Sequence, residues 1–184
     1  MNKLDETRPF IALSIAVLTV SDTRTLEDDK SGDTLIMRLE LAGHRLAERT
    51  IIEDDVNAIR SKVQDWIARP DIDVILTTGG TGFTGRDVTP EAIEPLFEKR
   101  MDGFAAVFHA ISYSKIGTST LQSRAMAGLA GADSGTPTFI FCLPGSPSAC
   151  KDAWDGILAM QLDYRHRPCN FVEIMPRLSE HFKA

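Results

Sequence analysis

Three short runs of almost purely apolar residues constrain the fold of this chain more than any other feature of its sequence. They cover residues 11–20, 74–76 and 139–143, and each is followed by small or polar residues. Continuous apolar runs of this length are typical of strands buried on both faces, as in a parallel sheet. A further strand is predicted around residues 46–52, directly before an acidic stretch.

The segments between the predicted strands carry apolar residues at helical spacing. Gly43 stands where the first helix would stop, and Asp55 can cap the start of the second. Thr89 can cap a third helix, with Pro90 in its first turn. Helices are therefore predicted over residues 35–42, 56–67, from 89 onward, 104–114 and 153–162.

Strands that alternate with helices predict an α/β fold, a three-layer α/β/α sandwich with a mostly parallel sheet. A length of 184 residues, 43% of them hydrophobic, fits a single domain over residues 1–184. Residues 1–9 are expected to form a polar lead and residues 165–184 a C-terminal tail used in subunit packing. Polar loops or turns are predicted at residues 22–34, 118–124 and 128–137.

The carboxyl ends of parallel strands open toward one edge of the sheet, where ligands bind in α/β folds. The sequence places small, hydroxylated, acidic or glycine residues after each predicted strand. These are Ser21 and Asp22, Asp54 and Asp55, Gly79 to Gly82, and Pro144, Gly145 and Ser146. Turns favour such residues for backbone reasons alone, but four agreeing loops favour a binding site.

The overall charge and hydropathy exclude some partners. The formal net charge is −6, and nucleic-acid-binding proteins normally present a basic face, so DNA and RNA are not expected as partners. The longest apolar run is about half as long as a membrane-spanning helix, and no signal peptide is recognisable. We therefore expect no membrane association and a cytoplasmic location.

The cysteines and histidines do not predict a structural metal or disulfide framework. Cys142, Cys150 and Cys169 form no C-x-x-C pair and are expected to be core thiols. The four histidines are scattered without the spacing of zinc ligands and are expected mostly at the surface.

The segment TTGGTGFTGRDVTP at residues 77–90 admits three interpretations. A nucleotide P-loop needs a lysine, and no lysine lies between Thr77 and Lys99. A dinucleotide-binding fingerprint normally follows the first strand and opens a helix at once, whereas this loop follows the third strand. A third interpretation is a loop whose backbone N–H groups face an anion. A tight turn would explain the glycines equally well, but it has no use for Arg86 and Asp87, which favour the anion site.

This segment, TVSD at 19–22, EDD at 53–55 and LPGSP at 143–147 together resemble the MoaB/MogA family of molybdenum-cofactor biosynthesis proteins, which includes the N-terminal domain of gephyrin. The resemblance covers roughly residues 10 to 175, with several motifs in order. The stretches at 116–128 and 150–171 look more like the MoaB branch.

The resemblance implies the molybdopterin-binding type of fold, a homotrimer or homohexamer, and contact with the protein that inserts molybdate. It also implies transfer of AMP from ATP, with Mg²⁺, to the terminal phosphate of molybdopterin. Carried onto this chain, the family's two essential acids match Asp54 and Asp87. Residues that match the phosphate cradle and flanking contacts are Ser21, Asp22, Gly79, Gly80, Thr81, Gly82, Ser123, Pro144, Gly145 and Ser146. Many relatives have proline where this chain has Glu53, whereas residues 86–90 are intact, which favours an active enzyme.

The implied chemistry agrees with elementary electrostatics. A carboxylate about 4 Å from a phosphate would cost on the order of 4 kcal/mol at an effective dielectric of 20. Asp54 and Asp87 therefore need a cation, and Mg²⁺ prefers one or two carboxylates together with phosphate oxygens. Arg86 can bind the phosphates or pair with Asp87, and Ser123 can serve the site or cap a helix; the sequence leaves both open. A non-catalytic carrier of molybdopterin is the alternative function.

Overall fold

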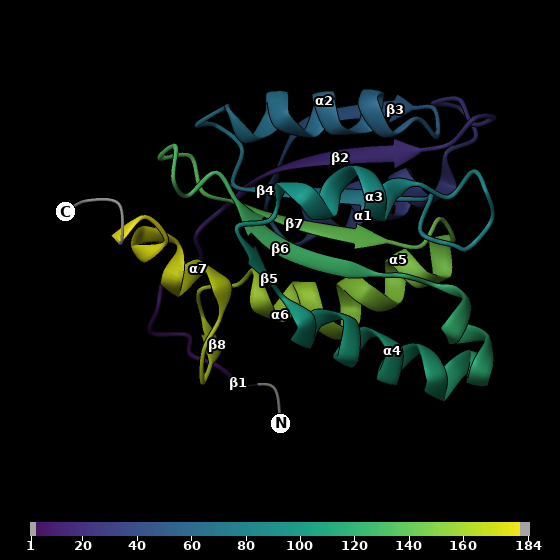
Figure 1. Ribbon diagram of the computed structural model, residues 1–184. Helices are drawn as coiled ribbons and strands as arrows, with labels where there is room; N and C mark the ends of the chain where they lie inside the picture. Colours follow the sequence, from purple (N-terminus) through teal and green to yellow (C-terminus); the bar gives the residue numbers. More distant parts are fainter. Residues whose placement is uncertain (1–2, 181–184) are drawn as a thin grey trace.

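The computed structural model describes residues 3–180 and is built around a six-stranded sheet. The strand order is β3-β2-β4-β7-β6-β5, and the layers are visible in Figure 1. These strands are β2 (Ser14–Val20), β3 (Arg45–Ile52), β4 (Val74–Thr78), β5 (Lys99–Arg100), β6 (Met126–Ala130) and β7 (Thr138–Leu143). Strands β3, β2, β4 and β7 are mutually parallel. The prediction of a mostly parallel sheet is confirmed.

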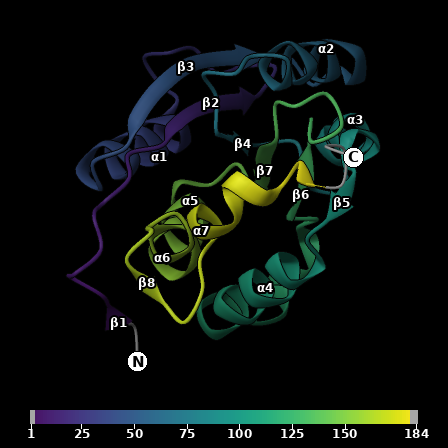
Figure 2. The same ribbon diagram turned by 90° about the vertical axis from the view of Figure 1, so that its left-hand side faces the viewer.

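Helices cover both faces of the sheet (Figures 1 and 2). One face packs against α2 (Val56–Ile67) and α3 (Thr89–Ile93), which contribute Ile59, Val63, Trp66 and Ile93 to the core. The other face packs against α1 (Lys30–Leu41), α4 (Asp102–Ile116) and α5 (Pro147–Ala153). Strands β2, β4 and β7 are buried on both sides because their residues alternate between these two cores.

The remaining elements are short. They are β1 (Lys3–Leu4), η1 (Glu94–Leu96), η2 (Gly117–Gln122), the π-helical turn η3 (Trp154–Leu158), α6 (Ala159–Gln161), β8 (His166–Arg167), α7 (Phe171–Ile174) and η4 (Met175–Arg177). The long final helix expected from the sequence thus has a π-helical segment between α5 and α6. No helix of the described residues is long and apolar enough to cross a membrane.

Strand β6 runs antiparallel to β7, and this direction matters for the site. The carboxyl ends of β2, β3, β4 and β7 share one edge, and the antiparallel β6 begins at that edge. Residues just before β6, including Ser123 and Arg124, are therefore delivered beside the loops that follow the parallel strands. The sequence predicted only a hairpin or loop at 128–137 and did not indicate this strand.

Four local predictions were wrong. Helix α1 begins at Lys30, inside the predicted loop, because the Asp29 side chain caps it by accepting from the Gly32 N–H at 2.9 Å. Thr89 is not the cap of α3, since its hydroxyl donates to the Gly79 carbonyl at 2.8 Å. Cys169 is exposed, unlike the buried Cys142 and Cys150. His44 and His166 are buried rather than at the surface, and His181 lies outside the described residues.

Strand β1, near the start of the chain, lies beside β8 in the predicted C-terminal tail (Figure 2). Strand β1 pairs antiparallel with β8, which joins the predicted polar lead to the predicted tail. Arg8 adds a hydrogen bond to the Tyr164 carbonyl at 2.9 Å and an ion pair with Glu173 at 2.6 Å. Phe171 and Val172 pack on the core of their own chain. At least this part of the tail is used within the chain, not only in subunit packing.

Candidate functional site

The glycine loop after β4 adopts a backbone shape that only glycine tolerates. Gly79 and Gly80 have φ angles of +102° and +62°, in the region that side chains rarely adopt. A Cβ at Gly79 would overlap the Val20 carbonyl oxygen, and one at Gly80 would overlap the Thr89 hydroxyl. The loop is thus pressed between the end of β2 and the start of α3, which fixes its path at the sheet edge.

Asp87 is held against the glycine loop by Thr84. The Thr84 N–H and hydroxyl donate to Asp87 Oδ2 at 2.8 and 2.6 Å. A Cβ placed on Gly82 would lie 2.7 Å from Asp87 Oδ2, so the carboxylate rests directly on this glycine. Burial raises the pKa of the Asp87 carboxyl, but the Thr84 hydrogen bonds outweigh it and hold the pKa below its ordinary value. Asp87 is therefore ionised at neutral pH.

Asp54 rests on the same loop from the β3 side. A Cβ on Gly80 would lie 2.8 Å from Asp54 Oδ1. Partial burial, together with the negative charges of Asp22 and Asp87, raises the pKa of the Asp54 carboxyl above its ordinary value. Asp54 and Asp87 thus lie against two glycines of the same loop, Gly80 and Gly82, and their negative charges repel each other.

Arg86 pairs with Asp22 and not with Asp87. Its Nε donates to Asp22 Oδ2 at 2.7 Å and its Nη2 to Asp22 Oδ1 at 2.5 Å. The Asp54 N–H also donates to Asp22 Oδ1, at 3.1 Å. Asp22 is therefore a link between the loop after β3 and the glycine loop, and its pKa is lowered first by the Arg86 hydrogen bond.

Arg124 clamps the glycine loop from the β6 side. Its Nε donates to the Gly82 carbonyl at 2.7 Å and its Nη2 to the Asp87 carbonyl at 2.8 Å. Its backbone N–H donates to the Thr81 carbonyl at 2.8 Å, and its Nη1 pairs with Glu91. The sequence indicated no such role, because the contact depends on the direction of β6.

An open cleft of about 700 Å³ lies between the glycine loop, the loop after β7 and the α4–η2 segment. Its lining includes nine of the thirteen residues predicted for the site: Gly79, Gly80, Thr81, Gly82, Asp87, Ser123, Pro144, Gly145 and Ser146. The other four, Ser21, Asp22, Asp54 and Arg86, do not line it. Of these, Asp22, Asp54 and Arg86 are linked on the β3 side of the loop.

Two of the predicted hydroxyl groups also have structural partners. The Ser146 hydroxyl caps α5 by accepting from the Ala149 N–H at 3.2 Å. The Ser21 hydroxyl accepts from the Arg24 N–H at 3.2 Å and shapes the turn after β2. The Ser123 hydroxyl is buried and has no hydrogen-bond partner within residues 3–180. Ser123 does not cap the start of a helix, since it is the C-cap residue at the end of η2.

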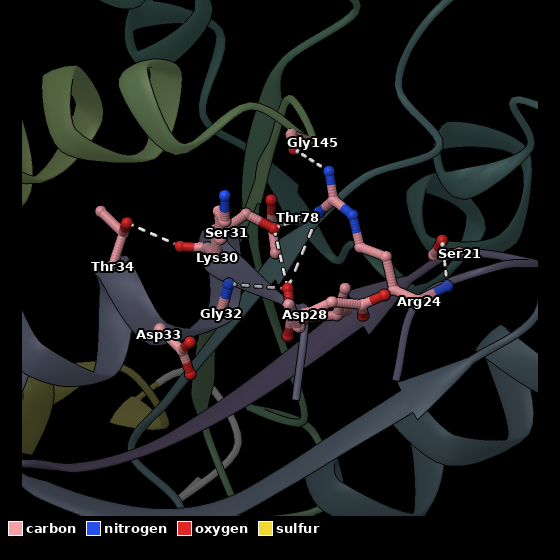
Figure 3. A network of polar contacts seen from close by, with 12 residues as sticks. Ser21, Arg24, Asp28, Lys30, Ser31, Gly32, Asp33, Thr34, Thr78 and Gly145 are labelled. Atoms are coloured by element: carbon pink, nitrogen blue, oxygen red, sulfur yellow. Dashed lines mark hydrogen bonds and ion pairs between the residues drawn. The ribbon is translucent and has the colours of Figure 1, made fainter. Parts of the chain in front are cut away.

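Arg24 also lines the cleft, although the sequence did not single it out. Figure 3 shows its guanidinium reaching across to Gly145, with Nη2 donating to the Gly145 carbonyl at 2.9 Å. Its Nη1 donates to the Ser31 hydroxyl at 2.5 Å. Arg24 lies in a polar loop between predicted elements, where one arginine carries no distinguishing pattern.

The donor set suits a divalent cation that is shared with phosphate. No group of three or more His, Cys, Asp or Glu residues suited to a metal occurs among residues 3–180. Asp54 and Asp87 provide two carboxylates that repel each other, and the charge of Arg86 offsets the negative charge at Asp54 only in part, since the pKa of Asp54 remains raised. Mg²⁺ is commonly held by one or two carboxylates plus phosphate oxygens and water. The residues present therefore fit Mg²⁺.

Comparison with known proteins gives the family. A family model described as "Probable molybdopterin binding domain" matches residues 16–164. The chain belongs to this molybdopterin-binding-domain family. It is 50% identical over 162 residues to the molybdenum cofactor biosynthesis protein B of Escherichia coli (strain K12), covering 88% of this chain and 92% of that protein.

Solved structures place the chain in the MoaB branch of the family. A crystal structure of a molybdenum cofactor biosynthesis protein B superposes with a TM-score of 0.78 at 34% identity, covering 95% of this chain and 98% of that one. The tungsten cofactor synthesizing protein MoaB from Pyrococcus furiosus gives a TM-score of 0.71 at 31% identity, covering 91% and 98%. The resemblance seen in the sequence motifs is thereby confirmed.

Proposed function

We propose that this protein binds molybdopterin in the cleft and transfers AMP from ATP to its terminal phosphate, as a molybdopterin adenylyltransferase. The observation that carries the proposal is the placement of Asp54 against Gly80 and of Asp87 against Gly82, two glycines of one loop separated by a single residue. Membership of a molybdopterin-binding-domain family supports the choice of substrate.

The reaction is a displacement at phosphorus. A terminal phosphate oxygen of molybdopterin forms a bond to the α-phosphorus of ATP, the bond to the bridging oxygen breaks, and pyrophosphate leaves. Such reactions need positioning and charge stabilisation more than a covalent nucleophile from the protein. Bound Mg²⁺ supplies the positive charge that this transfer requires.

The chain's own residues bind and orient the reactants. Asp87, ionised and fixed by Thr84, and Asp54, on the other side of the loop, would hold the cation. Gly79, Gly80 and Gly82 have no side chains and would let the backbone of the loop approach the phosphates closely. Ser123, with its unpartnered hydroxyl, and the loop from Pro144 to Ser146 would contact the substrates from the far side.

The decisive experiment is product formation from purified molybdopterin and ATP with Mg²⁺. We expect adenylylated molybdopterin and pyrophosphate from the wild type. Asp54→Ala and Asp87→Ala should each lower the rate by about 100-fold or more, the size of effect seen when a group that stabilises transition-state charge is removed. Glu53→Gln removes an adjacent exposed charge and serves as the matched control, with a rate near that of the wild type.

A non-catalytic molybdopterin carrier is the second candidate. It is favoured by one observation, that Asp54 does not line the cleft although Asp87 does. A carrier would bind molybdopterin equally well after Asp87→Ala and would release no pyrophosphate at any protein concentration. That pair of results would replace the adenylyltransferase proposal.

We also propose that the chain assembles as a homotrimer or homohexamer and contacts the protein that inserts molybdate. Exposed apolar side chains on and next to α4, namely Val107, Tyr113, Ile116 and Leu121, support an interface on this side. Light scattering coupled to size exclusion would give the mass of the assembly. A monomer at micromolar concentration would contradict the proposal.

A further inference from the structure

Three arginines lie around the glycine loop, and they differ in how much of each guanidinium is already used. Arg124 donates from all three of its side-chain nitrogens to acceptors of its own chain. Arg86 is bound through Nε and Nη2 to Asp22 and does not line the cleft. Neither is placed to take an anion inside the cleft.

Among residues 3–180, Arg24 is the one cationic side chain that lines the cleft. It donates from Nη2 to the Gly145 carbonyl and from Nη1 to the Ser31 hydroxyl. A guanidinium has five N–H donors in a fixed fork, so these two bonds do not use all the donors of Arg24. Its side chain is 31% exposed, which agrees with a group that is anchored but still reachable.

The anchor beneath Arg24 is rigid. Asp29 is fully buried and lies 3.7 Å from Arg24 Nη1, and it also accepts from Ser31 and from the Thr19 hydroxyl. Ser31 accepts from Arg24 and donates to Asp29, so the guanidinium is linked through this hydroxyl to a buried carboxylate. An arginine fixed in this way loses little conformational entropy when it binds a planar or tetrahedral oxyanion.

The neighbourhood of Arg24 is suited to a phosphate. Gly145, whose carbonyl Arg24 contacts, packs on Gly79, since a Cβ on Gly145 would lie 3.2 Å from Gly79 Cα. The guanidinium therefore stands at the end of the cleft where the loop after β7 meets the glycine loop. We propose that Arg24, and not Arg86, is the arginine that binds a phosphate group of the substrates in this cleft.

This inference rests on the proposed function for the identity of the substrates, but it is tested by binding alone. The probe is inorganic pyrophosphate with Mg²⁺, measured by titration calorimetry. Arg24→Gln should weaken binding roughly 10- to 100-fold, the range for loss of hydrogen bonds to a charged group. Arg24→Lys keeps the positive charge but lacks the planar guanidinium, so its affinity for pyrophosphate should lie between those of the wild type and Arg24→Gln.

Arg49→Gln is the matched control. Arg49 also pairs with Asp29, at 3.0 Å, but it does not line the cleft. Arg49→Gln should lower the melting temperature while leaving the pyrophosphate affinity within about twofold of that of the wild type. A loss of affinity in Arg49→Gln equal to that in Arg24→Gln would mean that Arg24 acts only by neutralising Asp29, and would overturn the proposal.

Separate titrations with AMP and with a pterin phosphate identify which substrate carries the phosphate that Arg24 binds. A selective loss for either one in Arg24→Gln supports the proposal and names the source. Unchanged affinity for pyrophosphate, AMP and the pterin phosphate in a folded Arg24→Gln protein overturns it, as does the absence of any binding to the wild type. If affinity depends on Arg24 but no adenylylated product forms, the phosphate site stands and the adenylyl-transfer proposal fails.

Discussion

Arg86 and Asp22 form a two-point ion pair between residues that are 64 positions apart in the sequence, with Nε–Oδ2 and Nη2–Oδ1 distances of 2.7 and 2.5 Å. The pair joins the glycine loop to the loop after β2. It also holds Arg86, the arginine of the family motif, outside the cleft. The cation that faces the cleft is instead Arg24, from a loop without a motif.

The first prediction concerns this pair. Arg86→Gln should leave the melting temperature nearly unchanged, because the Arg86 side chain is 66% exposed and such pairs contribute little to stability. It should raise the KM for Mg-ATP, since the freed Asp22 carboxylate adds negative charge beside Asp54. The double variant Asp22→Asn/Arg86→Gln should recover most of the affinity. No recovery would show that Arg86 contacts the substrate directly.

The second prediction is that two glycines of the loop differ in how much an alanine substitution destabilises the protein. Gly79→Ala should destabilise the protein by about 3 kcal/mol or more, from positive-φ strain and overlap with the Val20 carbonyl. Gly85→Ala is the matched control in the same loop, because a Cβ there meets nothing within 4 Å and its φ is not positive. Chemical denaturation measures both. Equal destabilisation of the two variants would contradict the described path of the loop.

The third prediction is that Asp54 lowers the stability of the folded protein but is required for activity. Its pKa is raised in the folded state by burial and by Asp22 and Asp87. Between the ordinary pKa and the raised pKa, the folded protein therefore binds more protons than the unfolded chain. At higher pH the carboxylate is ionised in both states, and its charge then destabilises the folded state. Asp54→Asn should be more stable than the wild type at pH 7 and inactive in adenylyl transfer.

Melting temperatures of the wild type and Asp54→Asn, measured from pH 3 to pH 8, test how this stability difference changes with pH. The advantage of Asp54→Asn should be largest at neutral pH and vanish as the pH falls below the ordinary pKa of 3.8, where the carboxyl is protonated in both the folded and the unfolded state. An advantage that grew at low pH would contradict the proposed repulsion.

The fourth prediction compares two carboxylates that pair with Arg49. Asp29 is fully buried and caps α1, whereas the Asp33 side chain is 56% exposed. Asp29→Ala should cost about 3–5 kcal/mol of folding free energy, since it leaves a partly buried guanidinium without its carboxylate. Asp33→Asn should cost less than about 1 kcal/mol. Urea unfolding distinguishes them, and similar costs would refute the role of burial.

The fifth prediction concerns the clamp made by Arg124. Arg124→Met leaves the Gly82 and Asp87 carbonyls without their donor, so hydrogen exchange at residues 82–87 should become faster. The turnover number should fall more than the affinity for Mg-ATP, because Asp87 loses its fixed position. Arg124→Lys should restore part of the protection. Unchanged exchange in Arg124→Met would rule out a positioning role.

Much of the fold follows from local patterns. The apolar runs locate the buried strands, and the spacing of Ile59, Val63 and Trp66 with Asp55 as a cap gives α2 as observed. Asp54 and Asp87 were assigned only through the resemblance of separated motifs to a known family, whereas the glycine loop is also visible in the sequence as a run of glycines behind a buried strand. Such features depend on residues within one element or turn, so their periodicity is present in the chain itself.

The tertiary structure alone decided which side chains meet. Arg24 contacts Gly145 across 121 positions, and Arg86 selects Asp22 over its neighbour Asp87. Ser123 and Arg124 reach the site because β6 is antiparallel, a direction that no local pattern encodes. These contacts depend on the order and direction of strands in the sheet, which bring distant segments to a common edge. The sequence therefore determined the helices, the strands and the glycine loop. The packing of the sheet determined which charged side chains surround that loop.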